Sequence, residues 1–242
     1  MPVKVYSSIA DIYTHLMRSI DYKVWADYIY EISRELKKKR PFALELAGGT
    51  GSVAKLLSAK MKLVSSDISL PMLRNDKTGK IPKVCCDMMH LPFKNKFDLI
   101  FSTFDSVNYL NTKEKFIKYL NSAGSCISED GILSFDVSLE NNSKKYEKYL
   151  NRRGKINGIT FQQRSFYNPS TRVHYNHFSL KYDDGRTTEE IHKQKIYRFD
   201  EYFDFIDRSD FYVHNCFKAF TFKNADSETE RAQFILKKKK LC

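Results

Sequence analysis

The residues with the clearest chemical meaning are an acid and a group of glycines at the end of an apolar segment. Residues 42–46 are apolar except for Glu45, and Ala47, Gly48, Gly49 and Gly51 follow closely. Glycine lets the backbone turn sharply and approach a ligand, and the start of the helix that follows offers free N–H donors. This arrangement predicts a loop that binds a nucleotide-like ligand.

Two kinds of cofactor fit this loop. Gly49-x-Gly51-x-x-Ala54 matches the relaxed dinucleotide-binding pattern, and Asp67 follows about 20 residues on, where an acid would bind a ribose. Glu45, however, would repel a pyrophosphate, whereas its charge suits an ammonium group and a sulfonium centre. The charge favours S-adenosylmethionine over NAD. A P-loop is excluded because no Gly-Lys-Ser or Gly-Lys-Thr follows the glycines.

Two more acids follow the next two predicted strands. Asp67 ends the strand at 62–66, where it can accept hydrogen bonds from both hydroxyls of a ribose. Asp87 follows the strand at 83–86, where it can accept from the exocyclic amine of an adenine while Met88 packs on the ring. Each acid alone would fit a turn or a helix cap. Three acids at the carboxyl ends of consecutive parallel strands instead indicate the ligand-binding edge of an α/β sheet.

The elements that must position these acids alternate along the first half of the chain. Residues 7–39 have a helical pattern, in which Asp21 can cap a helix and Val24, Tyr28 and Ile32 recur every four residues. Strands are predicted at 42–46, 62–66, 83–86, 97–101 and 131–137, with a helix before the last of them that stops near residues 130–131. Strands that alternate with helices predict a parallel sheet.

The pattern changes after about residue 155. Three segments of alternating polar and apolar residues are joined by turn-forming residues at 168–170 and 183–185, which predicts an antiparallel meander. A short helix at 201–208 and strands near 212–222 and 232–237 would complete a seven-stranded sheet. The fold class expected is therefore α/β and Rossmann-like, with a mostly parallel sheet, helices on both faces and an antiparallel insertion after the fifth strand.

Composition limits the classes of function. The formal net charge of +12 permits contact with nucleic acid, but the basic runs at 37–40 and 237–240 contain no aromatic residues and fit solvated element ends better than an RNA groove. No apolar run could span a membrane and no signal peptide is recognisable, so we expect a cytoplasmic protein without a membrane partner. The five cysteines, among them Cys242, lack a C-x-x-C pair and predict reduced thiols and no metal site.

These residues resemble the class I S-adenosylmethionine-dependent methyltransferases. The resemblance rests on residues 45–51, 67–73 and 86–88 and covers the chain from residue 1 to about 137. Residues 91–110 look like the fourth-strand region of a bacterial subgroup that acts on small molecules or has no assigned substrate. Tyr13 and Asp21-Tyr22-x-x-Trp25 look like the N-terminal helices that cover the cofactor in that subgroup, although Thr14 stands where an acidic residue is common.

The resemblance implies a role for each part of the chain. It implies one methyltransferase domain over 1–242, in which 1–40 cover the cofactor, 41–137 bind it, 156–198 form a substrate platform and 199–242 complete the sheet. The cofactor, S-adenosyl-L-methionine, would contact residues of the helices, of the glycine loop and of the strand ends. They are Tyr13, Tyr22, Trp25, Glu45, Ala47, Gly48, Gly49, Gly51, Asp67, Ile68, Met72, Asp87, Met88, Ser102 and Phe104.

The cofactor carries an already activated methyl group, so few catalytic residues are needed. Tyr13 and His192 are the catalytic candidates, and strand alternation places Glu190 and His192 on one face of the meander. His192 and Tyr175 would face the acceptor, although the same histidine could instead only anchor the meander.

N- or O-methylation of a small polar molecule is the leading interpretation. Neither Asn-Pro-Pro-Tyr nor Asp-Pro-Pro-Tyr follows the fourth strand, and no Pro-Cys pair could supply a thiolate for attack on a pyrimidine ring. Two alternatives stay open, an RNA methyltransferase and a non-catalytic S-adenosylmethionine-binding regulator. The meander could also join two copies in a homodimer.

Overall fold

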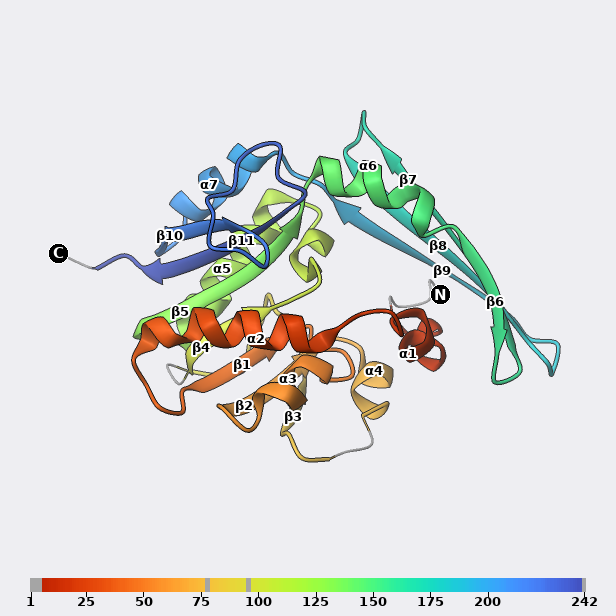
Figure 1. Cartoon of the computed structure of the whole chain (residues 1–242), viewed down its shortest axis with the longest axis horizontal. Coiled ribbons are helices and arrows are strands. Elements are labelled where there is room, and N and C mark those ends of the chain that lie inside the picture. The colour runs from red at the N-terminus through yellow and green to blue at the C-terminus, as the bar shows by residue number, and fades with distance from the viewer. Residues whose placement is uncertain (1–5, 77–78, 95–96, 241–242) are drawn as a thin grey trace.

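The computed structural model describes residues 6–76, 79–94 and 97–240, and in these residues two β-sheets organise the chain, one of seven strands and one of four (Figure 1). The larger sheet has the order β10-β11-β5-β4-β1-β2-β3 and the smaller one β6-β7-β8-β9. The strands are Phe42–Leu46 (β1), Lys62–Asp67 (β2), Lys83–Cys85 (β3), Phe97–Ser102 (β4), Ile127–Ser138 (β5), Arg152–Ile156 (β6), Ile159–Asn168 (β7), Val173–Tyr182 (β8), Thr187–Lys195 (β9), Phe211–Lys218 (β10) and Arg231–Lys238 (β11).

The larger sheet is parallel from β3 to β5, and β11 and β10 extend it antiparallel at one edge. The chain runs outward from β1 to β2 and β3, then returns to place β4 on the other side of β1. Strand order therefore reverses between β1 and β4, and ligands bind at the carboxyl ends of the strands beside such a reversal. The mostly parallel seven-stranded sheet and its antiparallel insertion after β5 confirm the predicted fold class.

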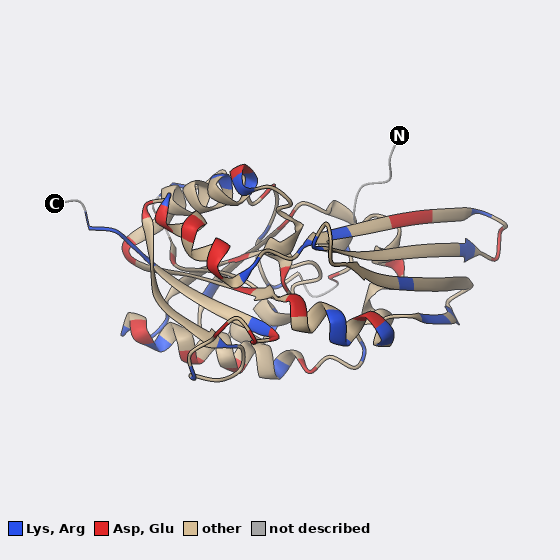
Figure 2. Ribbon diagram, turned by 90° about the horizontal axis from the view of Figure 1, so that it is seen from above, with Lys and Arg blue, Asp and Glu red and all other residues tan. Residues whose placement is uncertain are grey.

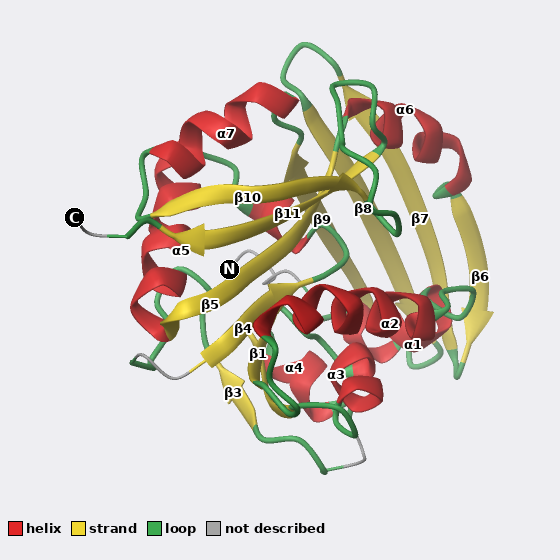
Figure 3. Ribbon diagram, turned by 60° about the vertical axis from the view of Figure 1, so that its left-hand side comes forward, coloured by secondary structure: helices red, strands yellow, loops and turns green. Residues whose placement is uncertain are grey.

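Helices cover both faces of this sheet (Figure 3). Because side chains alternate along a strand, Ala43 faces one helical layer and Leu44 the other. The helices α2 and α3 pack with Ala43, Leu63 and Leu99, whereas α5 and α7 pack with Leu44 and the aromatic side chains of β5 and β11. The helices are Tyr13–Leu16 (α1), Tyr22–Ser33 (α2), Ser52–Leu57 (α3), Leu70–Arg74 (α4), Lys113–Cys126 (α5), Glu140–Tyr149 (α6) and Phe199–Asp207 (α7), with 3₁₀ turns at Ile9–Asp11 (η1), Arg34–Leu36 (η2) and Ser106–Tyr109 (η3).

The N-terminal helical segment predicted at 7–39 is divided at Asp21, the residue predicted to cap a helix. Asp21 caps α2 by accepting a hydrogen bond from the Lys23 amide, and its backbone is extended, as an N-cap requires. The chain therefore turns between α1 and α2. This turn places η1 and α1 beside the four-stranded sheet, where Ile9, Ile12 and Leu16 pack on Phe161 and Phe178.

The antiparallel meander has one strand more than predicted. The turns at 168–173 and 182–187 separate β7, β8 and β9 as expected, but β6 precedes them and pairs with β7. Asn157 and Gly158 form the tight turn between β6 and β7, and both have positive φ, 49° and 76°. Asn-Gly, here between Ile156 and Ile159, is a strong hairpin signal, and it would have revealed β6.

Further boundaries differ from the sequence predictions, and β10 ends at Lys218 instead of near residue 222. The helix α5 ends at Cys126, and β5 begins at Ile127 instead of residue 131. The pairing of β4 with β5 shifts register between Phe97 and Leu99, which lets Ile127 join the sheet early.

The helix α6 was not predicted, because Ser143 is its one buried residue and it has no apolar stripe.

No helix of the described residues is long and apolar enough to cross a membrane. Cys85, Cys86, Cys126 and Cys216 are free thiols in the structure. Cys242 lies outside the described residues.

Candidate active site

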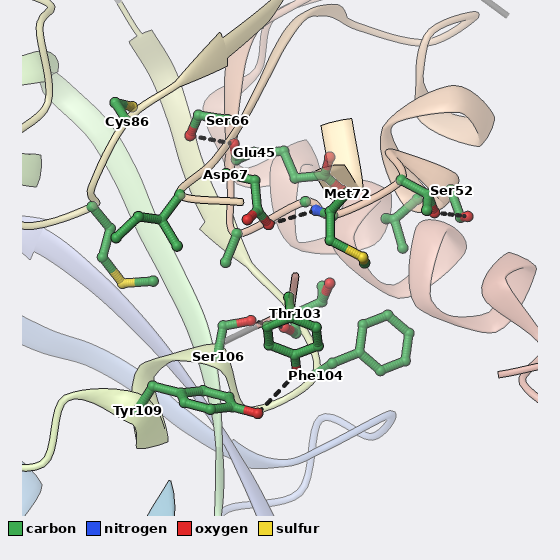
Figure 4. A pocket seen from close by; sticks show the side chains of 18 of the residues that line it. Glu45, Ser52, Ser66, Asp67, Met72, Cys86, Thr103, Phe104, Ser106 and Tyr109 are labelled. Carbon is green, nitrogen blue, oxygen red and sulfur yellow. Dashed lines mark hydrogen bonds between the residues drawn. The ribbon is translucent and has the colours of Figure 1, made fainter. Parts of the chain in front are cut away.

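A cavity of about 290 Å³ opens at the carboxyl ends of β1, β2 and β4, at the reversal of strand order (Figure 4). Such cavities are the usual place for a ligand in an α/β sheet. Figure 4 shows Glu45, Asp67 and Met72 on one side of the cavity and Thr103, Phe104 and Tyr109 on the other.

Glu45 is held at the end of β1 with almost no exposure to solvent, 1%. The Ser65 hydroxyl donates to its Oε2 at 2.6 Å. Burial raises the pKa of Glu45 to about 7, against the hydrogen bonds from Ser65 and the Ala54 amide, which lower it. A carboxylate that is costly to bury and faces a cavity is a site for a cationic group.

Gly48 is required by this carboxylate. A Cβ atom at residue 48 would lie 2.2 Å from Glu45 Oε2 and 2.3 Å from Ser65 Oγ, which no side chain tolerates. Glycine here lets the loop pass directly over Glu45 and keeps the cavity beside it open.

Asp67, at the end of β2, holds the loop through both of its oxygens. Oδ2 accepts from the Gly49 amide at 2.8 Å and Oδ1 from the Ser69 amide at 2.7 Å. Burial raises the pKa of Asp67, although the hydrogen bonds from these two backbone amides partly offset the increase. Each carboxylate oxygen can accept a second hydrogen bond, so Asp67 can also bind the hydroxyls of a ligand in the cavity.

Left-handed backbone conformations gather around the cavity. Ala47 has φ +51° and Gly49 +56°, and on the other side Phe104 has φ +60° and Asp105 +49°. Three of these four are not glycine, and such conformations are costly for residues with a Cβ atom. Backbone strain of this kind clusters at functional sites.

Most of the predicted cofactor residues line this one cavity. They are Tyr13, Tyr22, Glu45, Ala47, Gly48, Gly49, Asp67, Ile68, Met72, Asp87, Met88 and Phe104.

Three predicted cofactor residues lie behind the lining. Gly51, with φ +74°, is the N-cap of α3, and Ser102 is buried at the end of β4, where it pairs with Leu46. Trp25 packs at a tilt of 36° against Phe104 with ring centroids 4.3 Å apart, so it supports the wall of this cavity from behind and lines a second cavity instead.

A second cavity of about 410 Å³ lies between the first cavity and the four-stranded sheet. Four residues line both cavities, namely Tyr6, Tyr13, Phe104 and Tyr109. Polar side chains of β6, β7, β8 and β9 form much of the second cavity's wall, and several of them are buried. A buried polar surface that faces a cavity is typical of a binding site and not of a core.

A chain of hydrogen bonds leads from the four-stranded sheet to the residues shared by the two cavities. Glu190 Oε1 lies 2.8 Å from His192 Nε2, and His192 Nδ1 lies 2.7 Å from the Tyr109 hydroxyl. The Tyr109 and Tyr6 hydroxyls are 2.9 Å apart. Since an ionised carboxylate only accepts, Nε2 of His192 carries a proton, and in the Nε2–H tautomer Nδ1 accepts from Tyr109.

Glu190 is ionised in this arrangement and also fixes the N-terminal segment. Burial alone would raise the pKa of Glu190, but the hydrogen bonds from His192 and from the backbone amides of Ser8 and Ile9 lower it. Burial raises the pKa values of Tyr6, Tyr13 and Tyr109. These hydroxyls therefore stay protonated near neutral pH, so the Tyr109 hydroxyl can donate to His192 Nδ1.

The expectation that Tyr175 faces the acceptor was wrong. His174 and Asn176 point to the buried face of β8, so Tyr175 lies on the opposite face, where it stacks on Phe166 at 4.7 Å.

Tyr6 and Tyr109 also belong to the site, although neither was predicted from the sequence. Tyr109 is the last residue of η3, in the segment that connects the carboxyl end of β4 to α5, and this position was the signal for it. Nothing local marks Tyr6, which reaches the site through contacts with residues more than 100 positions away.

Comparisons with known proteins agree with this geometry. Residues 43–131 match the methyltransferase domain family. The chain is 26% identical to the putative methyltransferase YqeM of Bacillus subtilis, over 98% of both chains.

Solved structures show the same fold. A S-adenosylmethionine-dependent methyltransferase from Clostridium acetobutylicum is similar with a TM-score of 0.77 and 24% identity, over 96% of this chain and 98% of that one. The sugar N-methyltransferase KedS8 from Streptoalloteichus is similar with a TM-score of 0.71 and 15% identity, over 98% of this chain and 94% of that one.

Proposed function

The chain belongs to the class I S-adenosylmethionine-dependent methyltransferases, and we propose that it methylates a nitrogen or oxygen atom of a small polar molecule. The observation that carries the proposal is the pair of cavities that meet at Tyr6, Tyr13, Phe104 and Tyr109. The first cavity suits the cofactor and the second an acceptor, so the two reactants would meet at these four residues.

The residues of the first cavity fit the cofactor. Glu45 suits the ammonium group, Asp67 the ribose hydroxyls, and Asp87 with Met88 the adenine. Gly48 leaves the space beside Glu45 that a Cβ atom would fill. When bound, S-adenosylmethionine supplies a methyl group on a sulfonium sulfur, and we assign the predicted cofactor residues to holding it.

The second cavity suits a small acceptor. Its volume of about 410 Å³ is that of a small-molecule site, and Asn176, Gln163 and His174 offer hydrogen-bonding groups along its wall. The structurally similar KedS8 is a sugar N-methyltransferase. Both observations support a polar molecule of modest size as the acceptor.

The alternative of an RNA acceptor gains little from the charge distribution. Figure 2 shows basic and acidic residues interspersed along the helices and both sheets. Lysines of the two basic runs form ion pairs with acidic residues, among them Lys38–Asp98, Lys238–Glu129 and Lys239–Asp207. Neutralised lysines at element ends do not form the continuous basic groove that single-stranded RNA needs.

We assign the removal of the acceptor's proton to His192. An acceptor N–H or O–H beside Tyr109 would pass its proton to the tyrosine oxygen while the tyrosine hydroxyl gives its own proton to His192 Nδ1. Glu190 stabilises the imidazolium that results, as a carboxylate does in other histidine bases. Tyr13 would orient the acceptor as a neutral hydroxyl.

Three further expectations stay predictions. They are a cytoplasmic location, the division of one domain into the segments 1–40, 41–137, 156–198 and 199–242, and a homodimer through the four-stranded sheet. For the homodimer, Phe166 and Ile191 are half-exposed on the outer face of that sheet.

The proposal is tested by calorimetry and an acceptor screen. S-adenosylmethionine and S-adenosylhomocysteine are expected to bind and NAD is not, because Glu45 opposes a pyrophosphate. Cofactor-loaded protein is then screened against amines, amino sugars and bulk tRNA for release of S-adenosylhomocysteine. Turnover with tRNA alone would support the RNA alternative, and tight cofactor binding without any turnover would support the regulator.

Glu45 makes cofactor affinity depend on pH. Its pKa of about 7 in the free protein means that it is partly protonated near neutrality. A bound ammonium group requires the ionised form, so binding releases a proton below pH 7. The dissociation constant of S-adenosylhomocysteine is expected to rise as pH falls from 7.5 to 5.5, by up to about tenfold per unit. Calorimetry over this range measures the slope.

The matched variant is Glu45→Gln. This variant should bind S-adenosylhomocysteine more weakly than the wild type at pH 7.5, and its dissociation constant should change little with pH. A slope equal to that of the wild type would show that another group causes it and that Glu45 does not meet the ammonium.

A further inference from the structure

Arg152 is a half-buried arginine in the second cavity without a carboxylate partner in the described residues. Its Nε donates to Gln163 Oε1 at 2.7 Å and its Nη1 to the Leu16 carbonyl at 2.9 Å, and both acceptors are neutral. A guanidinium has five N–H groups, so most of its donors stay available. The second arginine of this cavity, Arg231, is by contrast paired with Asp105 and Asp136.

The surroundings of Arg152 increase the local positive charge. Burial lowers the pKa of Arg152, and the nearby charge of Arg18 lowers it further. A long arginine side chain on an edge strand could easily extend into water. An arginine that instead turns into a cavity beside another cation gains hydrogen bonds to neutral acceptors but no ion pair within the described residues, and an anion in the cavity would compensate both charges.

The side chain of Arg152 is also held in place. Gln163, which accepts from it, donates through Nε2 to Asn176 Oδ1 at 2.9 Å. Gln163 and Asn176 are buried on the inner face of the sheet. A guanidinium oriented by a buried hydrogen-bond network is preorganised for a carboxylate or a phosphate, which it can bind through two parallel N–H donors.

The position of Arg152 in the sheet sets its distance from the reacting end. Arg152 begins β6 and His192 lies on β9, the two edge strands of the four-stranded sheet. Their backbones are three strand spacings apart, roughly 14 Å. An acceptor that reaches both must therefore be extended, with its nucleophilic atom near Tyr109 and a second polar group several bonds away.

We propose that the acceptor carries an anionic group, a carboxylate or a phosphate, which Arg152 binds at the end of the second cavity remote from the methyl transfer. This inference rests on the proposed function, because it assigns the second cavity to the acceptor. It narrows the acceptor to amino or hydroxy compounds that carry an acid group at a distance from the methylated atom.

The experiment uses protein loaded with S-adenosylhomocysteine and two probes, inorganic phosphate and acetate, titrated separately and followed by ligand-observed NMR. At least one probe is expected to bind the wild type, and Arg152→Met should weaken that binding about 10- to 100-fold. Arg152→Lys, which keeps the charge but not the planar donor pair, should bind with intermediate affinity. Preference for one probe identifies the acid group as phosphate or carboxylate.

Two controls separate the possible failures. Arg172→Met removes a half-buried arginine that is paired with Glu140 and lines neither cavity, and it should leave probe binding unchanged. The affinity for S-adenosylhomocysteine, measured on each variant, reports the folded cofactor site. If the cofactor binds but neither probe does, or both bind Arg152→Met as well as the wild type, the anion inference is wrong and the proposed function stands. If S-adenosylhomocysteine does not bind even to the wild type, the proposed function is wrong, and the anion inference that rests on it falls with it.

Discussion

Replacement of His192 by alanine is expected to lower kcat/KM for methyl transfer by about 100- to 10,000-fold. His192 is 2% exposed, bonded on one side to Glu190 and on the other to Tyr109, so its loss removes the proton acceptor and leaves Tyr109 with no base. The affinity for S-adenosylmethionine should change little, because His192 lines the second cavity and not the first. Steady-state kinetics with the acceptor found by the screen, together with calorimetry, measure both quantities.

Three further measurements distinguish a base from a structural anchor. Added imidazole should restore part of the activity of His192→Ala, which it could not do for a misplaced sheet. Tyr109→Phe should lower kcat/KM as well, since it breaks the path between acceptor and base. Lys193→Ala, one residue along β9 on the exposed face, should behave as the wild type. If His192→Ala turns over as fast as the wild type, His192 takes no part in the reaction and only anchors the meander.

The cofactor side of the site could be predicted from the sequence because its determinants are local. Glu45 and Asp67 lie at the carboxyl ends of β1 and β2, Asp87 follows β3, and the alternation of strands with helices makes those strands parallel. Parallel strands present their carboxyl ends at one edge, so three separate acids had to lie near one another. The glycines between β1 and α3 mark the same edge through their backbone freedom.

The acceptor side could not be predicted in the same way, because long-range contacts create it. The Tyr6 amide bonds Glu190, 184 residues away, and no pattern in either segment indicates the other. Strand alternation did place Glu190 and His192 on one face. The face of the meander that turns toward the edge of the larger sheet depends on how η1 and α1 pack against the meander. That packing in turn depends on the break in the helical segment at Asp21.

The role proposed for Arg152 could not be predicted from the local sequence either. In the sequence this residue is one of two adjacent arginines, Arg152 and Arg153, at the start of the unpredicted strand β6. Only the pairing of β6 with β7 places Arg152 beside Gln163 on the inner face and leaves Arg153 exposed. Basic residues that bind a ligand cannot be told from solvated ones until the register of their strand is known.

Arg231→Met is expected to destabilise the protein by about 3–5 kcal/mol at pH 8. Arg231 Nη1 bonds Asp136 Oδ2 and Asp105 Oδ1, and Asp136 is fully buried in β5. Burial raises the pKa of Asp136 even with Arg231 present. Methionine fills a similar volume but leaves this carboxylate without its cation, and an unpaired buried charge costs far more than the pair gains. Urea unfolding without cofactor measures the loss.

The pH dependence of this loss identifies its cause. Without Arg231 the pKa of Asp136 in the folded protein rises further above its unfolded value of about 3.9, so the ionised carboxylate opposes folding at high pH and the penalty fades as the group takes up a proton. The deficit relative to the wild type should therefore be smaller at pH 5 than at pH 8. Arg198→Met, which removes an exposed arginine paired with Asp200, should leave stability nearly unchanged at both values. A loss in Arg231→Met that is equal at pH 5 and pH 8 would mean that packing against Trp25, and not the charge of Asp136, explains the effect.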